Sequence, residues 1–176
     1  MTIEVYSKKN TAIKITHPNK KNGLAIARLV ERCPPLDLNS TYHYFIQSHY
    51  FSKTSAVAFA NNEVIAFASG FILPENNNSL FIWQVAIDES YRGQGLGIEL
   101  INFILEQNHS VNTIETTVTK SNSSSRRMFE KISQKYESTV SEKVLFDGER
   151  DFSNEHESEI LITISTTIQG KKDEDI

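Results

Sequence analysis

The chain has 176 residues, of which 39% are hydrophobic and 10% are aromatic. This content is enough to bury one sizeable core and too small for two full domains, so we expect a single compact domain. The formal net charge is −4 at pH 7 and Lys and Arg are scattered, which argues against the nucleic-acid backbone as a partner.

Neither a membrane span nor a disulfide is expected. No run approaches the ~18 apolar residues that a membrane helix needs, and the first fifteen residues lack the apolar run of a signal peptide, so we expect a cytoplasmic protein. Cys33 is the single cysteine and is interpreted as a packing residue. No Cys and His pairs have zinc-ligand spacing, so no metal is expected.

The first half of the chain begins with a polar segment, residues 1–10, that we expect to be flexible. Apolar periodicity and the punctuation by Pro34-Pro35 and Asn61-Asn62 then predict the next elements. In chain order they are a strand at 12–16, a helix at 23–31, and two strands of an antiparallel hairpin at 56–60 and 64–73. The loop PENNNS at 74–79 ends that hairpin.

The second half opens on Leu80–Ile87, which is nearly all apolar and is predicted to be a central strand covered on both faces. The elements that follow are a helix at 96–107, a strand at 113–118, a helix at 124–132, and strands at 143–146 and 159–167. A charged tail ends the chain. We therefore expect one α/β domain at 11–168 between flexible ends at 1–10 and 169–176.

The turn RGQGLG at 92–97 lies between the apolar strand and the amphipathic helix. Its backbone N–H groups gather where a helix begins, and the first donors of a helix lack intrahelical partners. Glycine lets the main chain approach an anion closely, and Arg92 can add a charge-assisted bond at the rim. The turn is therefore predicted to cradle a pyrophosphate.

The spacing of this turn excludes two common nucleotide sites. It reads Gly-x-Gly-x-Gly rather than the dinucleotide fingerprint, and no acidic residue follows at the required distance on a second parallel strand. No Gly-Lys-Ser/Thr completes a P-loop. The predicted ligand is thus another phosphorylated cofactor.

Gln84–Ile87 followed by Arg92-x-x-Gly95-x-Gly97 resembles the core motif of the GNAT acetyltransferases. The resemblance implies a mixed, mostly antiparallel sheet with a splayed strand pair, flanked by helices, and acetyl-coenzyme A as cosubstrate. It implies that Trp83, Val85 and Ile87 hold the pantetheine arm. The cofactor-binding residues implied in this way are Val85, Ile87, Arg92, Gly93, Gln94, Gly95, Leu96, Gly97, Asn122, Ser125 and Phe129. The helix that contains Phe129 lacks the tyrosine that many members use to protonate the leaving thiolate.

The segment at 34–44 concentrates acidic and aromatic groups, which an amine acceptor needs because a lysine-like amine has a pKa of about 10.4. Asp37 can pair with an ammonium group. An alternative reading is structural: Ser40 caps a short helix whose aromatic side chains pack inward, and Asp37 and Asn39 form a turn. In this structural reading, the aromatic side chains that pack inward are those of Tyr42, Tyr44 and Phe45.

CPPLDLNSTYHY, FIWQVAIDESYRGQGLG, FDGERDF and the stretch His156–Glu159 together resemble the L-2,4-diaminobutyrate acetyltransferases of ectoine biosynthesis, over residues 12–165. That family acetylates the N4 amine of L-2,4-diaminobutyrate in bacteria under osmotic stress, and its members are homodimers. The resemblance implies a substrate site made of Asp37, Asn39, Tyr42, Trp83, His156 and Glu159. Of these, Glu159, Tyr42 and Asp37 are the candidate catalytic residues, with Glu159 as proton acceptor.

Alternatives remain at this level. Glu159 can equally be an exposed residue at a strand start, His156 can be a loop residue, and Ser158 stands where an acid is expected. The acceptor can be a polyamine, an aminoglycoside or a protein N-terminus, because a fold does not determine a substrate. The chain can also be a non-catalytic module that binds acyl-coenzyme A.

Overall fold

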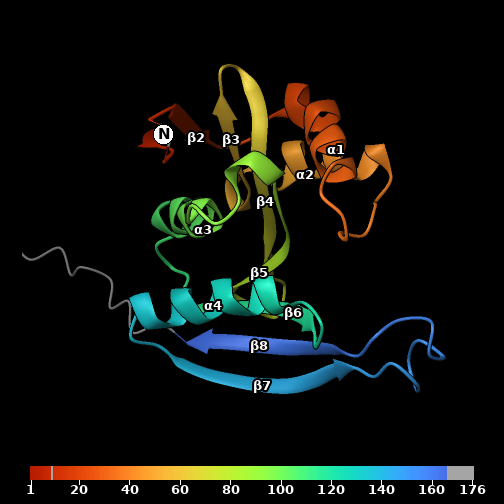
Figure 1. Ribbon diagram of the computed structural model, residues 1–176. Coiled ribbons are helices and arrows are strands. Elements are labelled where there is room, and N and C mark those ends of the chain that lie inside the picture. Colours follow the sequence, from red (N-terminus) through yellow and green to blue (C-terminus); the bar gives the residue numbers. More distant parts are fainter. Residues whose placement is uncertain (9, 166–176) are drawn as a thin grey trace, which may run out of the picture. The chain divides into compact units, whose positions relative to one another are not determined.

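A computed structural model describes residues 1–8 and 10–165 of the chain. Within these ranges the protein has eight strands, paired mostly antiparallel, and four α-helices (Figure 1). The chain divides into two compact units. The first comprises Met1–Phe71 and Ile82–Asn108, and the second comprises Ile72–Phe81 and the described residues from His109 to Ser165.

The first unit contains four strands in the order β1-β2-β3-β4, each antiparallel to the next. They are β1 (Thr2–Tyr6), β2 (Ala12–Thr16), β3 (Ala56–Ala60) and β4 (Glu63–Leu73). Asn61 and Asn62 join β3 to β4 with φ of 49° and 66°. Asparagine tolerates this left-handed region, so the predicted hairpin turn is confirmed.

The N-terminal residues, for which the sequence analysis expected a flexible segment, form strand β1. Thr2–Tyr6 pairs with Ala12–Thr16 from Thr2 opposite Thr16 to Tyr6 opposite Ala12. Only Ile3 and Val5 are partly covered. The alternation of Ile3 and Val5 with exposed residues extends over only five positions, too few to separate a strand from a polar segment, and the order of the strand comes from pairing with β2.

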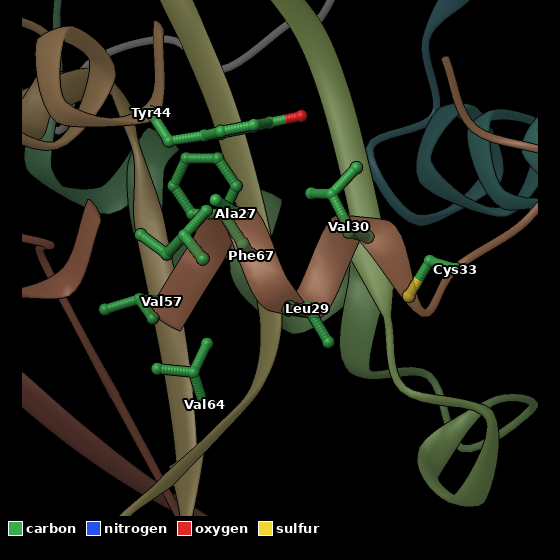
Figure 2. Close-up of a cluster of buried hydrophobic side chains, with 10 residues drawn as sticks. Ala27, Leu29, Val30, Cys33, Tyr44, Val57, Val64 and Phe67 are labelled. Carbon is green, nitrogen blue, oxygen red and sulfur yellow. The ribbon is translucent and has the colours of Figure 1, made fainter. Parts of the chain in front are cut away.

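Three helices belong to the first unit, α1 (Gly23–Glu31), α2 (Thr41–Tyr50) and α3 (Leu96–Gln107), and the bounds of α1 and α3 match the prediction. Figure 2 shows side chains of α1 packed with Tyr44 of α2 and with Phe67 of β4. Cys33 belongs to this core at 1% exposure, and its Sγ–H donates to Ile87 O over 3.3 Å. Its expected packing role is confirmed.

Strand β5 (Asn76–Ile87) is longer than predicted, because residues 76–79, expected in a loop, are part of it. Asn78 explains the extension: its Nδ2–H donates to Ser110 O over 2.6 Å, and its carbonyl accepts from the Asn112 N–H over 3.0 Å. The prediction that this strand is covered on both faces is wrong. Leu80, Ile82, Gln84 and Ala86 are buried, whereas Trp83 is 52% exposed.

The second unit contains the first part of β5, as far as Phe81, followed by strands in the order β6-β8-β7. β5 pairs in parallel with β6 (Thr113–Thr119) through Ser79–Phe81, and the other pairs are antiparallel. The remaining strands are β7 (Thr139–Phe146) and β8 (Glu159–Ser165), and residues 166–167 of the predicted last strand lie outside the described residues.

Helix α4 (Ser123–Lys135) extends the predicted helix by one residue at its start and three at its end. Arg126 of α4 contacts both carboxylate oxygens of Glu142 on β7 at 3.1 Å. β7 begins four residues before its predicted start. These four residues were not predicted as part of the strand because they are exposed on both faces and lack an alternating apolar pattern. No helix in the described part of the chain is long and apolar enough to cross a membrane.

Candidate active site

The turn at 92–97 has the backbone geometry expected of an anion cradle. Gly93 and Gly95 have φ of 70° and 83°, in the left-handed region that glycine adopts without steric cost. Gly95 is the N-cap of α3, and the N–H groups of Ile98 and Glu99 both point to its carbonyl. Within the described residues, no backbone acceptor pairs with the N–H groups of residues 93–97. These donors can therefore meet an anion.

The side chains of Arg92 and Gln94 point to protein groups in this turn. Arg92 Nε–H donates to Ile87 O over 3.0 Å, which fastens the end of β5 to the turn. Gln94 Oε1 accepts from the Lys8 N–H over 2.9 Å, and its Nε2–H donates to Ser90 O over 3.1 Å. Both side chains thus brace the turn, and the backbone supplies its donors.

The structure agrees only in part with the structural reading of the segment that leads into α2. Ser40 caps α2, since its hydroxyl accepts from the His43 N–H over 3.3 Å, and Tyr44 is buried at 2% exposure. Tyr42 and Phe45, by contrast, are 72% and 38% exposed, so the expectation that they pack inward is wrong. Tyr42 is therefore exposed to solvent, and its contact with a substrate stays a prediction.

A hydrogen-bonded chain that the sequence analysis missed joins α2, β5 and the segment before α2. Tyr44 Oη–H donates to Gln84 Oε1 over 3.4 Å, and Gln84 Nε2–H donates to Asp37 O over 3.2 Å. Gln84 is only 9% exposed, so its side-chain amide forms its hydrogen bonds with protein groups. It fixes the backbone at Asp37. The clue in the sequence is a glutamine inside an otherwise apolar strand.

His43 was also missed, and it lies beside Trp83 with ring centroids 5.8 Å apart. Its ring meets Tyr44 edge-on at 5.2 Å. The Nε2 atom is buried and has no hydrogen-bond partner within the described residues. Burial lowers the pKa of His43 from its ordinary 6.5, because the charged imidazolium is poorly solvated there.

This direction of the shift predicts how stability depends on pH. A histidine whose folded-state pKa is depressed stabilises the fold while it is neutral, and that contribution is lost as the pH falls through the folded pKa. We expect His43→Gln to lessen the fall in melting temperature below about pH 6.5. Thermal melts across this range check the result, with His49→Gln, an exposed position on the same helix, as control. Equal slopes in all three proteins would contradict it.

Glu159 and His156 lie together in the second unit. Glu159 opens β8 opposite Thr119 of β6 and Phe146 of β7. Its Oε1 is 3.9 Å from His156 Nε2, and its Oε2 is buried with no hydrogen-bond partner in the part of the chain described. His156 Nδ1 lies 2.7 Å from Glu157 O, so that nitrogen donates the hydrogen bond. This contact is consistent with the prediction that His156 and Glu159 belong to one substrate site.

Gly148 anchors the loop that carries His156. Its N–H donates to Ser158 Oγ over 2.9 Å, so the serine that stands where an acid was expected supplies the acceptor. A Cβ at Gly148 would lie 2.9 Å from His156 O and 3.2 Å from Ser158 N. Both contacts are to backbone, so a side chain larger than hydrogen must displace the loop.

We therefore expect Gly148→Ala to lower kcat/KM for the acceptor amine by roughly 10-fold, because small displacements of substrate-positioning groups are costly. The KM for the acyl donor should change little. Steady-state kinetics with both substrates varied check this, with Glu149→Ala, an exposed neighbour, as control. Wild-type kinetics in Gly148→Ala would show that this loop does not position the acceptor.

Asn122 and Ser125 lie at the start of α4, and Phe129 lies two turns into the helix. Asn122 is the N-cap, and its Oδ1 accepts from the Ser125 N–H over 3.1 Å. Phe129 is 3% exposed and, with Val140 and Ile162, lines a small surface pocket beside β7 and β8. Asn122 therefore caps the helix, and contact of the three residues with a cofactor stays a prediction.

Comparison with known proteins gives one family match and close relatives. The Acetyltransferase (GNAT) family matches residues 24–133, a range that covers parts of both units. The L-2,4-diaminobutyric acid acetyltransferase of Methylotuvimicrobium alcaliphilum is 38% identical over 154 residues, which cover 86% of this chain and 90% of the relative. The enzyme of the same name from Vibrio cholerae is 37% identical over 84% of this chain and 86% of its own length.

Solved structures give the same result. Diaminobutyrate acetyltransferase EctA from Paenibacillus lautus, in complex with its substrate L-2,4-diaminobutyric acid and coenzyme A, superposes with a TM-score of 0.84 at 31% identity. The similarity covers 89% of this chain and 96% of that one. The GNAT domain of S. lividans PAT has a TM-score of 0.71 at 10% identity over 93% and 96% of the two chains, which speaks for the fold alone.

Proposed function

Because this chain belongs to the GNAT family of acetyltransferases, we propose that it transfers acetyl from acetyl-coenzyme A to the N4 amine of L-2,4-diaminobutyrate. The product is N4-acetyl-L-2,4-diaminobutyrate, an intermediate of ectoine biosynthesis. The observation that carries the proposal is the similarity, along most of both chains, to an enzyme solved with that diamino acid and coenzyme A. The same similarity confirms the expected fold class.

The backbone donors at 93–97 suit the pyrophosphate of coenzyme A. The two left-handed glycines leave open space where a Cβ would stand, so an anion can approach the main chain there. The positive end of the α3 dipole adds to the attraction. When bound, the cosubstrate supplies a thioester carbonyl as the electrophile. Contact of the pantetheine arm with Val85 and Ile87 belongs to this proposal.

The acceptor must attack as a neutral amine. We assign Glu159 as the group that takes the proton, because one of its carboxylate oxygens is buried and lacks a protein donor among the described residues. The amine nitrogen bonds to the carbonyl carbon, the C–S bond breaks, and coenzyme A leaves as the thiolate, while the nitrogen of the new amide gives up its second proton to solvent. A backbone N–H near Val85 stabilises the oxyanion that develops in a ternary complex.

Asp37 accounts for the choice between the two amines. If its carboxylate holds the α-amine as a cation, only the N4 amine is free to lose its proton and attack. Gln84 supports this role, since it bonds to the Asp37 carbonyl and limits the motion of that residue. Tyr42, Asn39, Trp83 and His156 complete the proposed substrate contacts.

Four further predictions accompany this proposal. The two units act as one GNAT domain, for which the span of the family match is the support. The protein is a homodimer, it is cytoplasmic, and it needs no metal. Size-exclusion chromatography with light scattering tests the dimer, and activity after dialysis against a chelator tests the metal.

The deciding experiment measures thiol release from acetyl-coenzyme A with L-2,4-diaminobutyrate, and assigns the acetylated nitrogen by NMR. Transfer to N4 supports the proposal, and transfer to the α-nitrogen refutes the role of Asp37. A panel containing a polyamine, an aminoglycoside and a peptide N-terminus runs beside it. Preference for one of these amines would make it the substrate in place of diaminobutyrate. Binding of coenzyme A without any turnover would indicate a non-catalytic module.

A further inference from the structure

The glycine turn is joined to the N-terminal hairpin by one side chain. Gln94, in the middle of the turn, accepts from the backbone N–H of Lys8 over 2.9 Å, across 86 positions of the sequence. Its amide Nε2–H donates to Ser90 O over 3.1 Å, so both ends of the carboxamide are engaged. A residue at the mouth of the predicted cradle thus points to the start of the chain.

The hairpin holds the Lys8 N–H in place. Lys8 follows β1 by two residues, and Ser7 before it is buried at 9% exposure. Ser7 exchanges two hydrogen bonds with Thr11: its N–H donates to Thr11 O over 3.0 Å, and its Oγ accepts from the Thr11 N–H over 2.9 Å. The donor that Gln94 uses is therefore set by a closed turn between β1 and β2.

Direct packing between this hairpin and the turn is incomplete. A pocket of about 320 Å³, open to solvent, lies between them and is lined by Val5 and Ser7 on one side and by Tyr91 and Leu96 on the other. Gln94 lines the same pocket, and its hydrogen bond to the Lys8 N–H connects the hairpin to the turn.

We propose that Gln94 is a positioning residue through which the N-terminal hairpin sets the affinity of the glycine turn for the acyl carrier. Gly93 and Gly95 flank Gln94, and their positive φ angles orient the N–H groups of the turn. With the Gln94 side chain fixed at Lys8 and Ser90, the backbone between the two glycines keeps one orientation. The inference rests on the proposed function only in taking coenzyme A as the ligand.

A pair of variants at residue 8 isolates the bond. Lys8→Pro removes the backbone donor, whereas Lys8→Ala removes the side chain and keeps the donor. We expect Lys8→Pro to weaken coenzyme A binding by about 2- to 10-fold, the range for one lost hydrogen bond, and Lys8→Ala to bind like wild type. Calorimetric titration with coenzyme A is the readout and requires no turnover, so it stands even if diaminobutyrate is not acetylated.

Gln94→Met breaks the same bond without changing the backbone at residue 8, and it serves if Lys8→Pro fails to fold in a thermal melt. In the double variant Lys8→Pro/Gln94→Met, the loss of coenzyme A affinity should not exceed that of Gln94→Met alone, because both changes remove the same hydrogen bond. In kinetics, the KM for acetyl-coenzyme A should rise while kcat and the KM for the amine stay unchanged. Equal affinity of Lys8→Pro and Lys8→Ala, or additive losses in the double variant, would overturn the proposal.

Discussion

Glu159→Gln is expected to lower kcat by about 10²- to 10⁴-fold, the usual contribution of a general base. The amide keeps the size of the side chain and cannot take the proton that the substrate ammonium must lose before its neutral amine attacks. The KM for acetyl-coenzyme A should stay near the wild-type value, because the predicted cradle is formed by other residues. Initial rates with each substrate varied in turn check both parts of this expectation.

The matched control is Glu155→Gln, which removes the same charge from an exposed position four residues earlier. It should leave kcat unchanged. A His156→Gln variant tests whether His156 takes part in accepting the proton, because His156 Nε2 lies 3.9 Å from Glu159 Oε1. If Glu159→Gln retained full kcat, the proton would go to another group, and the assignment of Glu159 as acceptor would be refuted.

Gly95→Val is expected to weaken coenzyme A binding by at least about 5- to 30-fold. Gly95 has φ of 83°, and a residue with a Cβ pays roughly 1–2 kcal/mol in the left-handed region. The structure leaves nothing within 4 Å of the added Cβ, so crowding by protein atoms does not contribute. The turn escapes the strain by changing φ, which rotates its N–H groups away from the anion.

Gly95→Asn distinguishes backbone conformation from obstruction of the ligand. Asparagine adopts positive φ more readily than valine, so Gly95→Asn should bind coenzyme A more tightly than Gly95→Val. Calorimetry gives the affinities, and thermal melts show whether either variant loses stability. Equally weak binding by both variants would mean that any side chain blocks the ligand. Undiminished binding by both would remove the turn from the cofactor site altogether.

Helix α3 and its preceding turn could be predicted closely because their signals are local. The apolar stripe of 96–107 and the glycines before it are contiguous, and helix hydrogen bonds join residues four apart. Strand β1 and the first residues of β5 could not be predicted in this way. The order of β1 comes from its pairing with β2, and that of Asn76–Ser79 comes from contacts with Ser110 and Asn112, which the polar side chains of these residues do not reveal.

The candidate site divides in the same way. The cofactor turn was predicted from a short motif, and the candidate residues Asp37 and Glu159 were predicted from the resemblance to a known family. The contacts that hold them were not: Gln84 joins Asp37 to Tyr44, and Gly148 accommodates His156 and Ser158.

The α/β class, the position of the cofactor turn and the family of the chain follow from its amino-acid sequence, because each depends on neighbouring residues. The hydrogen bond of Gln94 to Lys8, and the exposure of Tyr42 beside the buried Tyr44, are visible only in the folded molecule. Hydrogen bonds and burial depend on which distant segments meet, and side-chain chemistry alone does not specify that meeting.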